Sequence, residues 1–310
     1  AVRKAMGQKI GKGAKLKWGS LIFCKNFSIG KDSIIGPFSI IKAHDFQMGN
    51  NAVVKPLAVI NTLKVKIANY VHIAPLVIIS SEFTEKSCLI IGEHSRIFPF
   101  CWLDTGEGIN IGKHVGVGGH TLIFTHGVWS NYVDGGPVSF GSVTIEDNVW
   151  LPWRVFIMPN TSIGENSIIG ANSLINKSIE KNSLAAGSPA KVIKKLEFDS
   201  TKKKERFLTV LEAYKRYLEF KFKRKYDFNG SQLILSQCKI VIDETEQLKP
   251  NDLLILLELD FKQTSSQIDK GVSILDYTSM IIDLKGNKNK EILLFVSFMR
   301  RFGIRLNIVK

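Results

Sequence analysis

Aliphatic side chains recur at every sixth position over more than half of this sequence. Four residues after each of them lies a small or β-branched residue. An α-helix would place apolar residues three or four positions apart, and a half-buried strand would place them two apart. A period of six therefore indicates a repeat architecture. The longest unbroken aliphatic series is Ile145, Leu151, Ile157, Ile163, Ile169 and Ile175.

The period predicts a coil of three short strands per turn, with corners between the strands, from about Ile10 to Ile193. Each aliphatic side chain points into a triangular shaft, and parallel backbone ladders join the stacked turns. Gly or Asn near each corner relieves a tight or left-handed backbone. Irregular stretches interrupt the repeat, and the longest of them leaves the shaft directly after His126. These stretches are residues 41–47, 60–66, 80–90 and 127–142.

The sequence changes character near residue 197. Residues 182–195 close the periodic region with small side chains and a basic tail, and residues 202–226 have apolar side chains three or four apart, which predicts an amphipathic helix. We therefore expect a mainly β chain, with a parallel β-helix domain over residues 1–197 and a small α+β domain over residues 198–310. Strand-like runs in the second domain lie at 232–235, 239–242, 253–259, 281–284 and 292–298.

The composition favours a soluble globular protein, with 45% hydrophobic residues. No apolar run reaches the roughly 18 residues that a membrane span needs, and no early segment resembles a signal peptide, so we expect a cytoplasmic protein. The four cysteines are scattered, and we expect structural roles for them. The net charge of +14 suits polyanionic partners, among them coenzyme A, nucleotide sugars, an anionic membrane surface and nucleic acid.

Two basic clusters mark the predicted helix, at residues 202–204 and 221–225. We interpret them as its solvated face. The sharper alternative is peripheral contact with an anionic membrane or with a lipid-linked sugar acceptor. Because no recognised nucleic-acid motif is present and basic residues are spread through the chain, we expect no nucleic-acid partner.

Histidine is the residue type that points to chemistry. His114, His120 and His126 are six residues apart, so they lie on successive sides of a three-sided coil. We therefore expect no metal site within one chain. His126 differs from the others because it stands where the repeat gives way to the long loop. A neutral imidazole there can accept a proton from a hydroxyl or amine.

These residues resemble the hexapeptide-repeat acyltransferases, and most closely their sugar O-acetyltransferases. In that family, whose coils wind left-handed, a histidine stands before a loop and ahead of a hexad pair that begins like Ile145-Glu146-Asp147-Asn148-Val149-Trp150. The close match continues through Lys194. The resemblance implies that His126 is the catalytic base, that acetyl-CoA is the acyl donor and that the protein is a homotrimer.

The resemblance also implies roles for individual positions. The backbone N–H of Trp153 would bind the developing oxyanion, and Ala171 would contact the pantetheine arm. Asn176 and Lys177 stand near the adenine nucleotide in the family, and Lys194, with Lys191 beside it, would meet the 3′-phosphate. The family has Trp-Ile-Gly and a small residue where this sequence has Trp150-Leu151-Pro152-Trp153. Trp153 keeps its N–H, whereas Pro152 has none.

Three polar side chains are candidates for binding the acceptor. Asp104 and Asp134 would either orient His126 or bind acceptor, and Tyr132 lies in the same Gly-rich loop as Asp134. From the resemblance we expect the acceptor to be a sugar of a surface polysaccharide or of its precursor. Two alternatives stay open at this point. One is an acyltransferase that uses acyl carrier protein and acts on a nucleotide sugar, and the other is a non-catalytic trimeric scaffold.

Overall fold

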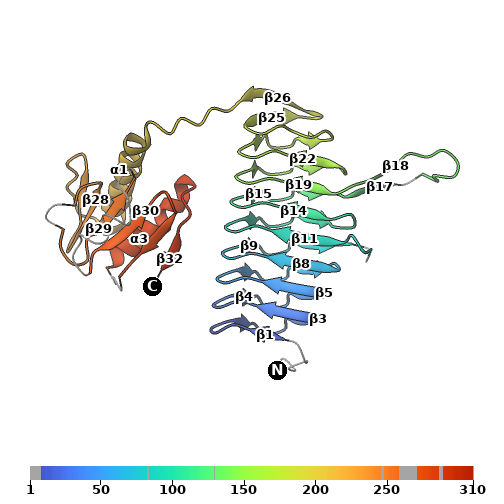
Figure 1. Ribbon diagram of the computed structural model, residues 1–310, viewed down its shortest axis with the longest axis horizontal. Coiled ribbons are helices and arrows are strands. Elements are labelled where there is room, and N and C mark those ends of the chain that lie inside the picture. The colour runs from blue at the N-terminus through green and yellow to red at the C-terminus, as the bar shows by residue number, and fades with distance from the viewer. Residues whose placement is uncertain are drawn as a thin grey trace. The chain divides into compact units, whose positions relative to one another are not determined.

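The computed structural model describes residues 8–81, 84–128, 130–245, 248–257, 271–285 and 289–309. The chain divides into two compact units, Ala1–Glu197 and Phe198–Lys310. The first unit, called the shaft below, is a column of stacked coils (Figure 1). Three walls of parallel strands enclose it, so the predicted parallel β-helix is confirmed.

The first wall is one ten-stranded sheet whose last pair is antiparallel. Its strands in spatial order are β2 (Lys15–Leu16), β4 (Ile34–Ile35), β6 (Val53–Val54), β9 (His72–Ile73), β12 (Arg96–Ile97), β15 (Gly116–Val117), β20 (Trp150–Leu151), β23 (Ile168–Ile169), β25 (Ser183–Gly187) and β26 (Ala190–Lys195). The sheet therefore runs the length of the shaft and ends in β26, which closes it.

The second and third walls belong to one continuous sheet. The second wall contains β7 (Val59–Asn61), β10 (Ile78–Ser80), β13 (Trp102–Asp104), β16 (Leu122–Ile123), β21 (Phe156–Ile157) and β24 (Leu174–Ile175). The third wall contains β8 (Lys64–Ile67), β11 (Cys88–Ile91), β14 (Ile109–Ile111), β19 (Val143–Ile145) and β22 (Thr161–Ile163). The two walls meet in β5 (Ile40–Met48), which pairs with both β7 and β8 and also with β3 (Leu21–Ile29); β3 in turn pairs with β1 (Lys9–Ile10).

The hexad aliphatic residues form the buried core of the shaft, as the period predicts. Ile97, Val117, Leu151 and Ile169, for example, are almost completely buried along the first wall. The irregular stretch 41–47 does not break the coil, because β5 runs through it as one nine-residue strand that turns from the second wall to the third. The six-residue spacing is interrupted in this stretch because the chain passes from the second wall to the third without a separate turn.

Gly and Asn residues have different roles at the corners of the coil. At several corners the left-handed backbone falls two residues after the hexad glycine, as at His114, His120 and Asn166, which have φ of 56°, 57° and 58°. Gly118 itself is needed for close approach, since a Cβ there would lie 2.4 Å from the carbonyl carbon of Pro152 in the next coil. Asn and His tolerate the left-handed region better than most residues, which gives His94, His114 and His120 a structural reason to occupy corners.

The described residues of the C-terminal unit form a six-stranded mixed sheet and two α-helices. The sheet order is β27 (Gln232–Ile234), β28 (Lys239–Ile242), β29 (Leu253–Leu256), β30 (Ser273–Asp276), β31 (Ile281–Asp283) and β32 (Asn307–Val309). Helix α1 (Lys203–Phe222) and helix α3 (Lys290–Phe298), which continues into the 3-10 helix η1 (Met299–Phe302), share one core with the sheet. The ring of Tyr214 on α1 lies 4.9 Å from that of Phe295 on α3, so both helices cover the same face.

The prediction of a strand at residues 292–298 is wrong, because these residues belong to α3. Asn289 caps the helix, and its side-chain oxygen accepts the N–H groups of Glu291 at 2.8 Å and Ile292 at 3.3 Å. Ile292, Phe295 and Val296 are buried. A short apolar run fits a buried strand and a buried helix equally well, and the cap decides between them. The predicted strand 253–259 ends at Leu256, with residues 258–259 outside the described residues, and β30 and β32 were not predicted.

No helix among the described residues is both long enough and apolar enough to cross a membrane.

A buried carboxylate joins α1, α3 and the sheet edge. Glu291 accepts hydrogen bonds from the Tyr226 hydroxyl at 2.8 Å and the Ser236 N–H at 3.1 Å, and it forms an ion pair with Arg224. Burial raises the pKa of Glu291, but the hydrogen bonds from Ser236 and Tyr226 and the Arg224 charge outweigh it, so the pKa lies below its usual value. The charged form is therefore the one that stabilises the fold.

We predict that Glu291→Gln lowers the free energy of unfolding of the C-terminal unit by about 2 kcal/mol, the scale of a hydrogen bond to a charged group. Because the pKa is depressed in the folded state, the contribution is present above the unfolded value of about 4.3 and is lost as pH falls through the folded value. Urea unfolding at pH 7 and pH 3.5 measures both effects. Glu212→Gln on the exposed side of α1 is the control; equal effects of the two variants at pH 7 would contradict the prediction.

Candidate active site

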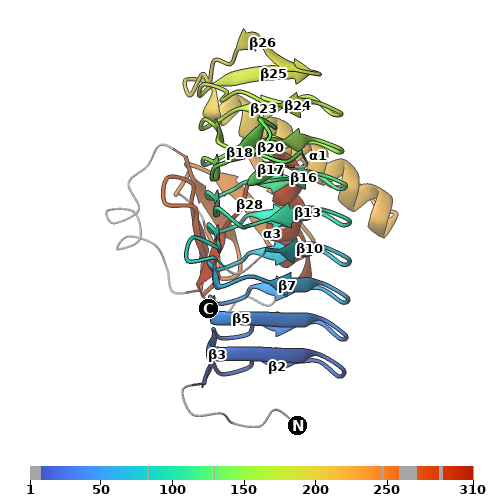
Figure 2. The same ribbon diagram turned by 90° about the vertical axis from the view of Figure 1, so that its right-hand side faces the viewer.

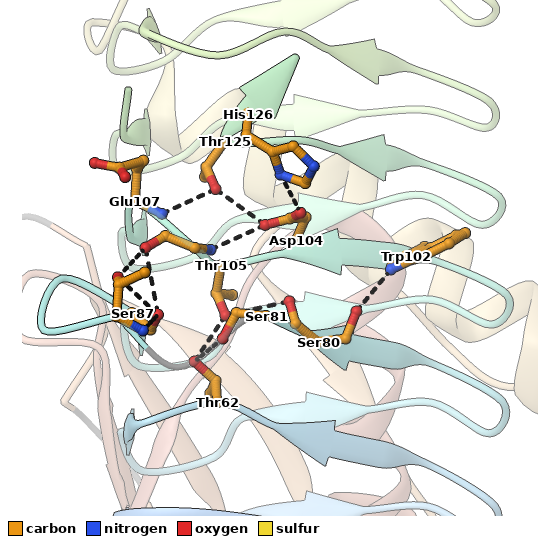
Figure 3. Close-up of polar contacts among 12 residues, drawn as sticks. Thr62, Ser80, Ser81, Ser87, Trp102, Asp104, Thr105, Glu107, Thr125 and His126 are labelled. Atoms are coloured by element: carbon orange, nitrogen blue, oxygen red, sulfur yellow. Dashed lines mark hydrogen bonds and ion pairs between the residues drawn. The ribbon is translucent and has the colours of Figure 1, made fainter. Parts of the chain in front are cut away.

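His126 and Asp104 lie side by side at the corner between the second and third walls. His126 opens the short strand β17 (His126–Val128), where the chain leaves the shaft, and Asp104 ends β13 in the coil below. The distance from His126 Nδ1 to Asp104 Oδ2 is 2.6 Å. Figure 3 shows the imidazole edge facing the carboxylate, with the second ring nitrogen directed away from it.

Asp104 is fixed from its other side. Its Oδ1 accepts hydrogen bonds from the Gly106 N–H at 2.9 Å and from the Thr125 hydroxyl at 3.1 Å. The Thr125 hydroxyl in turn accepts the N–H of Glu107 at 3.0 Å, which leaves its proton for Asp104. The Asp104 side chain is only 10% exposed, whereas that of His126 is 44% exposed. The Asp104 carboxylate is therefore buried and fixed in position by its hydrogen bonds, whereas the His126 imidazole is accessible to solvent.

This arrangement determines how His126 can act. A carboxylate only accepts hydrogen bonds, so Asp104 requires the proton of a neutral imidazole to be on Nδ1. The Nε2 lone pair is then free to take a proton from a hydroxyl or amine. A carboxylate beside Nδ1 also stabilises the imidazolium that such a transfer creates. The geometry is that of a general base with an orienting partner.

A column of hydroxyl side chains supports this corner from below. The Thr105 hydroxyl donates to the Thr62 hydroxyl at 2.7 Å, and that of Ser81 donates to the same atom at 3.2 Å. Thr62 and Thr105 are buried. Figure 3 shows these groups stacked beneath Asp104. Such a satisfied network makes the corner rigid.

Aromatic side chains flank His126 along the outer face of the second wall. The ring of Phe124 lies 6.3 Å from His126, 5.6 Å from Phe156 and 5.6 Å from Trp102. Trp102 donates its indole N–H to the Ser80 hydroxyl at 2.9 Å. Sequence reasoning missed this aromatic cluster, in which Trp102 and Phe156 lie on β13 and β21 and Phe124 follows β16 in the coil between them.

The structure does not bring Trp153 to His126 within one chain. Trp153 lies at the corner between the first and second walls, where its ring is 5.8 Å from that of His120. His120 and His126 stand on opposite sides of β16, at the two edges of the second wall. Among the described residues the Trp153 N–H makes no hydrogen bond, and its carbonyl accepts the Asn172 N–H at 3.1 Å.

The predicted donor-binding residues are exposed but spread along the upper shaft. Ala171 lies one coil above Trp153 at the same corner. Asn176 and Lys177 follow β24 on the corner that also carries His126, whereas Lys191 and Lys194 lie on the closing strand β26. Within a single chain these five positions occupy two corners and the end of the first wall.

Two of the three predicted acceptor residues lie on the arm that leaves the shaft. Strand β17 pairs with β18 (Val138–Phe140) in an antiparallel hairpin that projects from the coils (Figure 1). Tyr132 and Asp134 lie exposed in its connecting loop, and Asp134 accepts a hydrogen bond from the Asn131 amide at 2.6 Å. Asp104 is instead nearly buried against His126, so the structure gives it the orienting role and not that of a free acceptor contact.

His94, His114 and His120 belong to the packing of the corners. His94 and His114 stack at 5.2 Å, and His120 stacks on Phe100 at 4.9 Å (Figure 2 gives the side view of the coils). No group of three or more His, Cys, Asp or Glu side chains in the described part of the chain is arranged to hold a metal ion.

Comparisons with known proteins give a consistent family. The family model "Bacterial transferase hexapeptide (six repeats)" matches residues 142–177. The galactoside O-acetyltransferase of Escherichia coli is 30% identical over 128 residues, which cover 34% of this chain and 63% of that protein. A Schizosaccharomyces pombe protein named as an acetyltransferase is 48% identical over 61 residues, which cover 19% of this chain and 30% of that protein. The chain thus spans less than two thirds of these curated relatives.

A solved structure is also similar to part of the chain. The maltose O-acetyltransferase of Clostridium difficile 630 is 30% identical and matches with a TM-score of 0.36, over 41% of this chain and 67% of that one. The six-residue period, the coil and the family-model match agree. Residues 142–177 therefore carry the bacterial transferase hexapeptide repeat, and the chain is similar to acetyltransferases that contain it.

Proposed function

We propose that this protein is an acetyltransferase that transfers the acetyl group of acetyl-CoA to a sugar hydroxyl, with His126 as general base. The observation that carries the proposal is the 2.6 Å contact between His126 Nδ1 and the buried Asp104 carboxylate. The names of the relatives, among them a galactoside O-acetyltransferase, support the donor and the acceptor class. A sugar of a surface polysaccharide or of its precursor is the acceptor we favour within that class.

The residues define a direct transfer. His126 Nε2 takes the proton of the acceptor hydroxyl while the hydroxyl oxygen attacks the thioester carbonyl carbon. The new C–O bond forms, the C–S bond breaks, and the imidazolium returns its proton to the thiolate, so His126 ends neutral. Asp104 keeps the ring oriented and stabilises its positive charge between the two steps. No nucleophilic side chain needs to carry the acetyl group.

The contact between His126 and Asp104 also helps to choose between the alternative functions. A non-catalytic scaffold gives no reason to hold a buried carboxylate against a half-exposed imidazole, so the scaffold is the weaker hypothesis. Acyl carrier protein as donor would use the same general base. The exposed Lys177, Lys191 and Lys194 suit the phosphates of either carrier, so the donor must be tested directly.

The site is completed by a second copy of the chain in this proposal. Trp153, whose N–H would hold the oxyanion, and His126 lie at opposite edges of the same wall. When copies pack in a closed ring, one edge of each shaft faces the other edge of the next. The outer face of this wall is apolar enough for such an interface. Its exposed side chains include Leu21, Phe23, Ile40, Ile78 and Trp102. We propose a homotrimer, with the donor between adjacent shafts.

We predict that His126→Ala lowers kcat for acetyl transfer at least about 100-fold, the usual contribution of a general base, with little change in the KM for acetyl-CoA. Thiol release from acetyl-CoA over a panel of sugars measures the rate, and acetyl-loaded acyl carrier protein is run in parallel as donor. His44→Ala is the matched control, because His44 is also exposed on the shaft and lies 3.0 Å from Asp45. An unchanged rate in His126→Ala would remove this residue from the mechanism.

We predict that Asp104→Asn lowers kcat at least about tenfold, because an amide can donate to Nδ1 and so favour the tautomer in which Nε2 carries the proton. Combined with His126→Ala it should cause no further loss, since both changes remove one unit. Steady-state kinetics of the single and double variants test this. Asp45→Asn is the control. Additive losses in the double variant would show that Asp104 acts independently of His126.

We predict that the protein sediments at about three times the 34.7 kDa chain mass and that Ile78→Asp dissociates it with loss of activity, because a charge is placed on the proposed interface. Analytical ultracentrifugation and the transfer assay test both. Ile90→Asp is the control, since Ile90 is 41% exposed on the third wall and Ile78 is 42% exposed on the second. A monomer with full activity would contradict the shared site.

A further inference from the structure

The C-terminal unit carries a hollow beside α1 that the proposed acetyl transfer does not use. Its volume is about 530 Å³, within the range of ligand pockets. The floor and sides are apolar, and cationic side chains of α1 stand at the rim. The residues that define it are Phe198, Lys203, Arg206, Val210, Phe302 and Ile304.

The two exposed phenylalanines of this hollow come from different elements. Phe198 belongs to the segment that precedes α1, and Phe302 ends η1. Each presents much of its ring to solvent. Aromatic rings at the mouth of an apolar hollow are costly to leave in water, and they mark a surface that contacts an apolar or interfacial partner.

Helix α1 and the residues that follow it carry an excess of positive charge. Between residues 202 and 225 the sequence has ten Lys and Arg against three Glu. Arg206 is held at the rim, because it donates to the Asp199 carbonyl and lies 3.5 Å from the Asp199 carboxylate. Lys203 makes no ion pair with the described residues. An anionic partner therefore meets Lys203, which has no ion pair among the described residues, beside Arg206, which is paired with Asp199.

The same flank of α1 continues past the hollow with the same chemistry. Lys203, Arg206, Val210, Tyr217 and Lys221 are spaced so that they follow one side of the helix. The Arg301 guanidinium of η1 lies 5.9 Å from the Tyr217 ring. Aromatic and basic groups thus alternate from the hollow to the last turn.

The last turn of α1 extends this surface. Phe220 is 74% exposed, and the ammonium of Lys223 lies 4.3 Å from its ring. Lys221 donates to the Tyr217 hydroxyl at 3.2 Å. Cations and rings arranged together in this way match the headgroup region of a bilayer, where both find partners.

We propose that this flank of α1 with η1, from the hollow to Phe220, docks the protein on an anionic membrane surface. The cations meet lipid phosphates, the exposed phenylalanines enter the headgroup region and the apolar hollow receives hydrocarbon of one lipid. The helix does not insert, because its main apolar stripe, which includes Phe207, Leu211 and Leu218, is buried in the core of the unit. Contact is therefore peripheral and depends on charge.

The test uses the full-length protein and sedimented vesicles of phosphatidylcholine, with or without 30% phosphatidylglycerol, a composition of about one anionic lipid in three. We expect binding only to the anionic vesicles, and weaker binding as salt rises. The triple variant Lys203→Glu, Lys221→Glu and Lys223→Glu should bind at least about tenfold more weakly. Phe220→Ser with Phe302→Ser should also weaken binding, without a change in net charge.

A second triple variant separates a docking surface from general basicity. Lys12→Glu, Lys15→Glu and Lys31→Glu change the net charge equally but lie exposed on the shaft, and they should leave vesicle binding within about twofold. Thermal unfolding and acetyl transfer to a soluble sugar verify that each variant is folded. Equal binding to neutral vesicles, no binding to either, or an equal loss in the two triple variants would overturn the proposal.

Discussion

The structure depends on one constraint, the stacking of each coil on the coil below it in register. Parallel ladders place Ile97 beside Val117 and Val117 beside Leu151, so the aliphatic column, the backbone hydrogen bonds and the corners all repeat together. Each side chain then has neighbours determined by position in the coil and not by distance in the sequence. Columns of like chemistry result, such as the hydroxyls of Thr62 and Thr105 or the stacked rings of His94 and His114.

The candidate active site uses this constraint and departs from it at one point. Leu122 pairs with Trp102 below and with Phe156 above, although the excursion over residues 127–142 separates Leu122 from Phe156 in the sequence. The ladder closes over the excursion, so the coil remains rigid on both sides of it. His126 is the residue at which the backbone departs, and unlike His114 and His120 it is not in the left-handed region. Its side chain is therefore positioned by Asp104 and not by corner packing.

The sequence predicts most of the shaft because a period of six leaves few alternatives, and it identifies His126 because a loop follows directly. It offers Asp104 and Asp134 as partners for His126 without choosing between them, since Asp104 comes into contact only when the pairing of Leu103 with Ile123 is known. The sequence alone also does not show that Trp153 and His126 lie at opposite edges of the second wall, because this too depends on the strand register. In the C-terminal unit the apolar run at 292–298 has no strong periodicity, so the cap at Asn289 decides for helix. The local sequence pattern is sufficient to predict structure where the repeat is strict. It is insufficient where tertiary contacts determine the secondary structure or the partner of a side chain.

The Pro152-Trp153 pair is accommodated by the coil beneath it. A Cβ at Gly118 would lie 2.4 Å from Pro152 backbone atoms, and one at Gly119 would lie 2.4 Å from the Trp153 ring. Gly118 thus permits close approach of the backbone at Pro152, and Gly119 leaves the space that the Trp153 ring occupies. The ring rests over Gly119 and against His120, while the Trp153 N–H makes no hydrogen bond with the described residues. In the proposed site, the Pro152-Trp153 pair reshapes the wall beside the donor and keeps the Trp153 N–H as a hydrogen-bond donor.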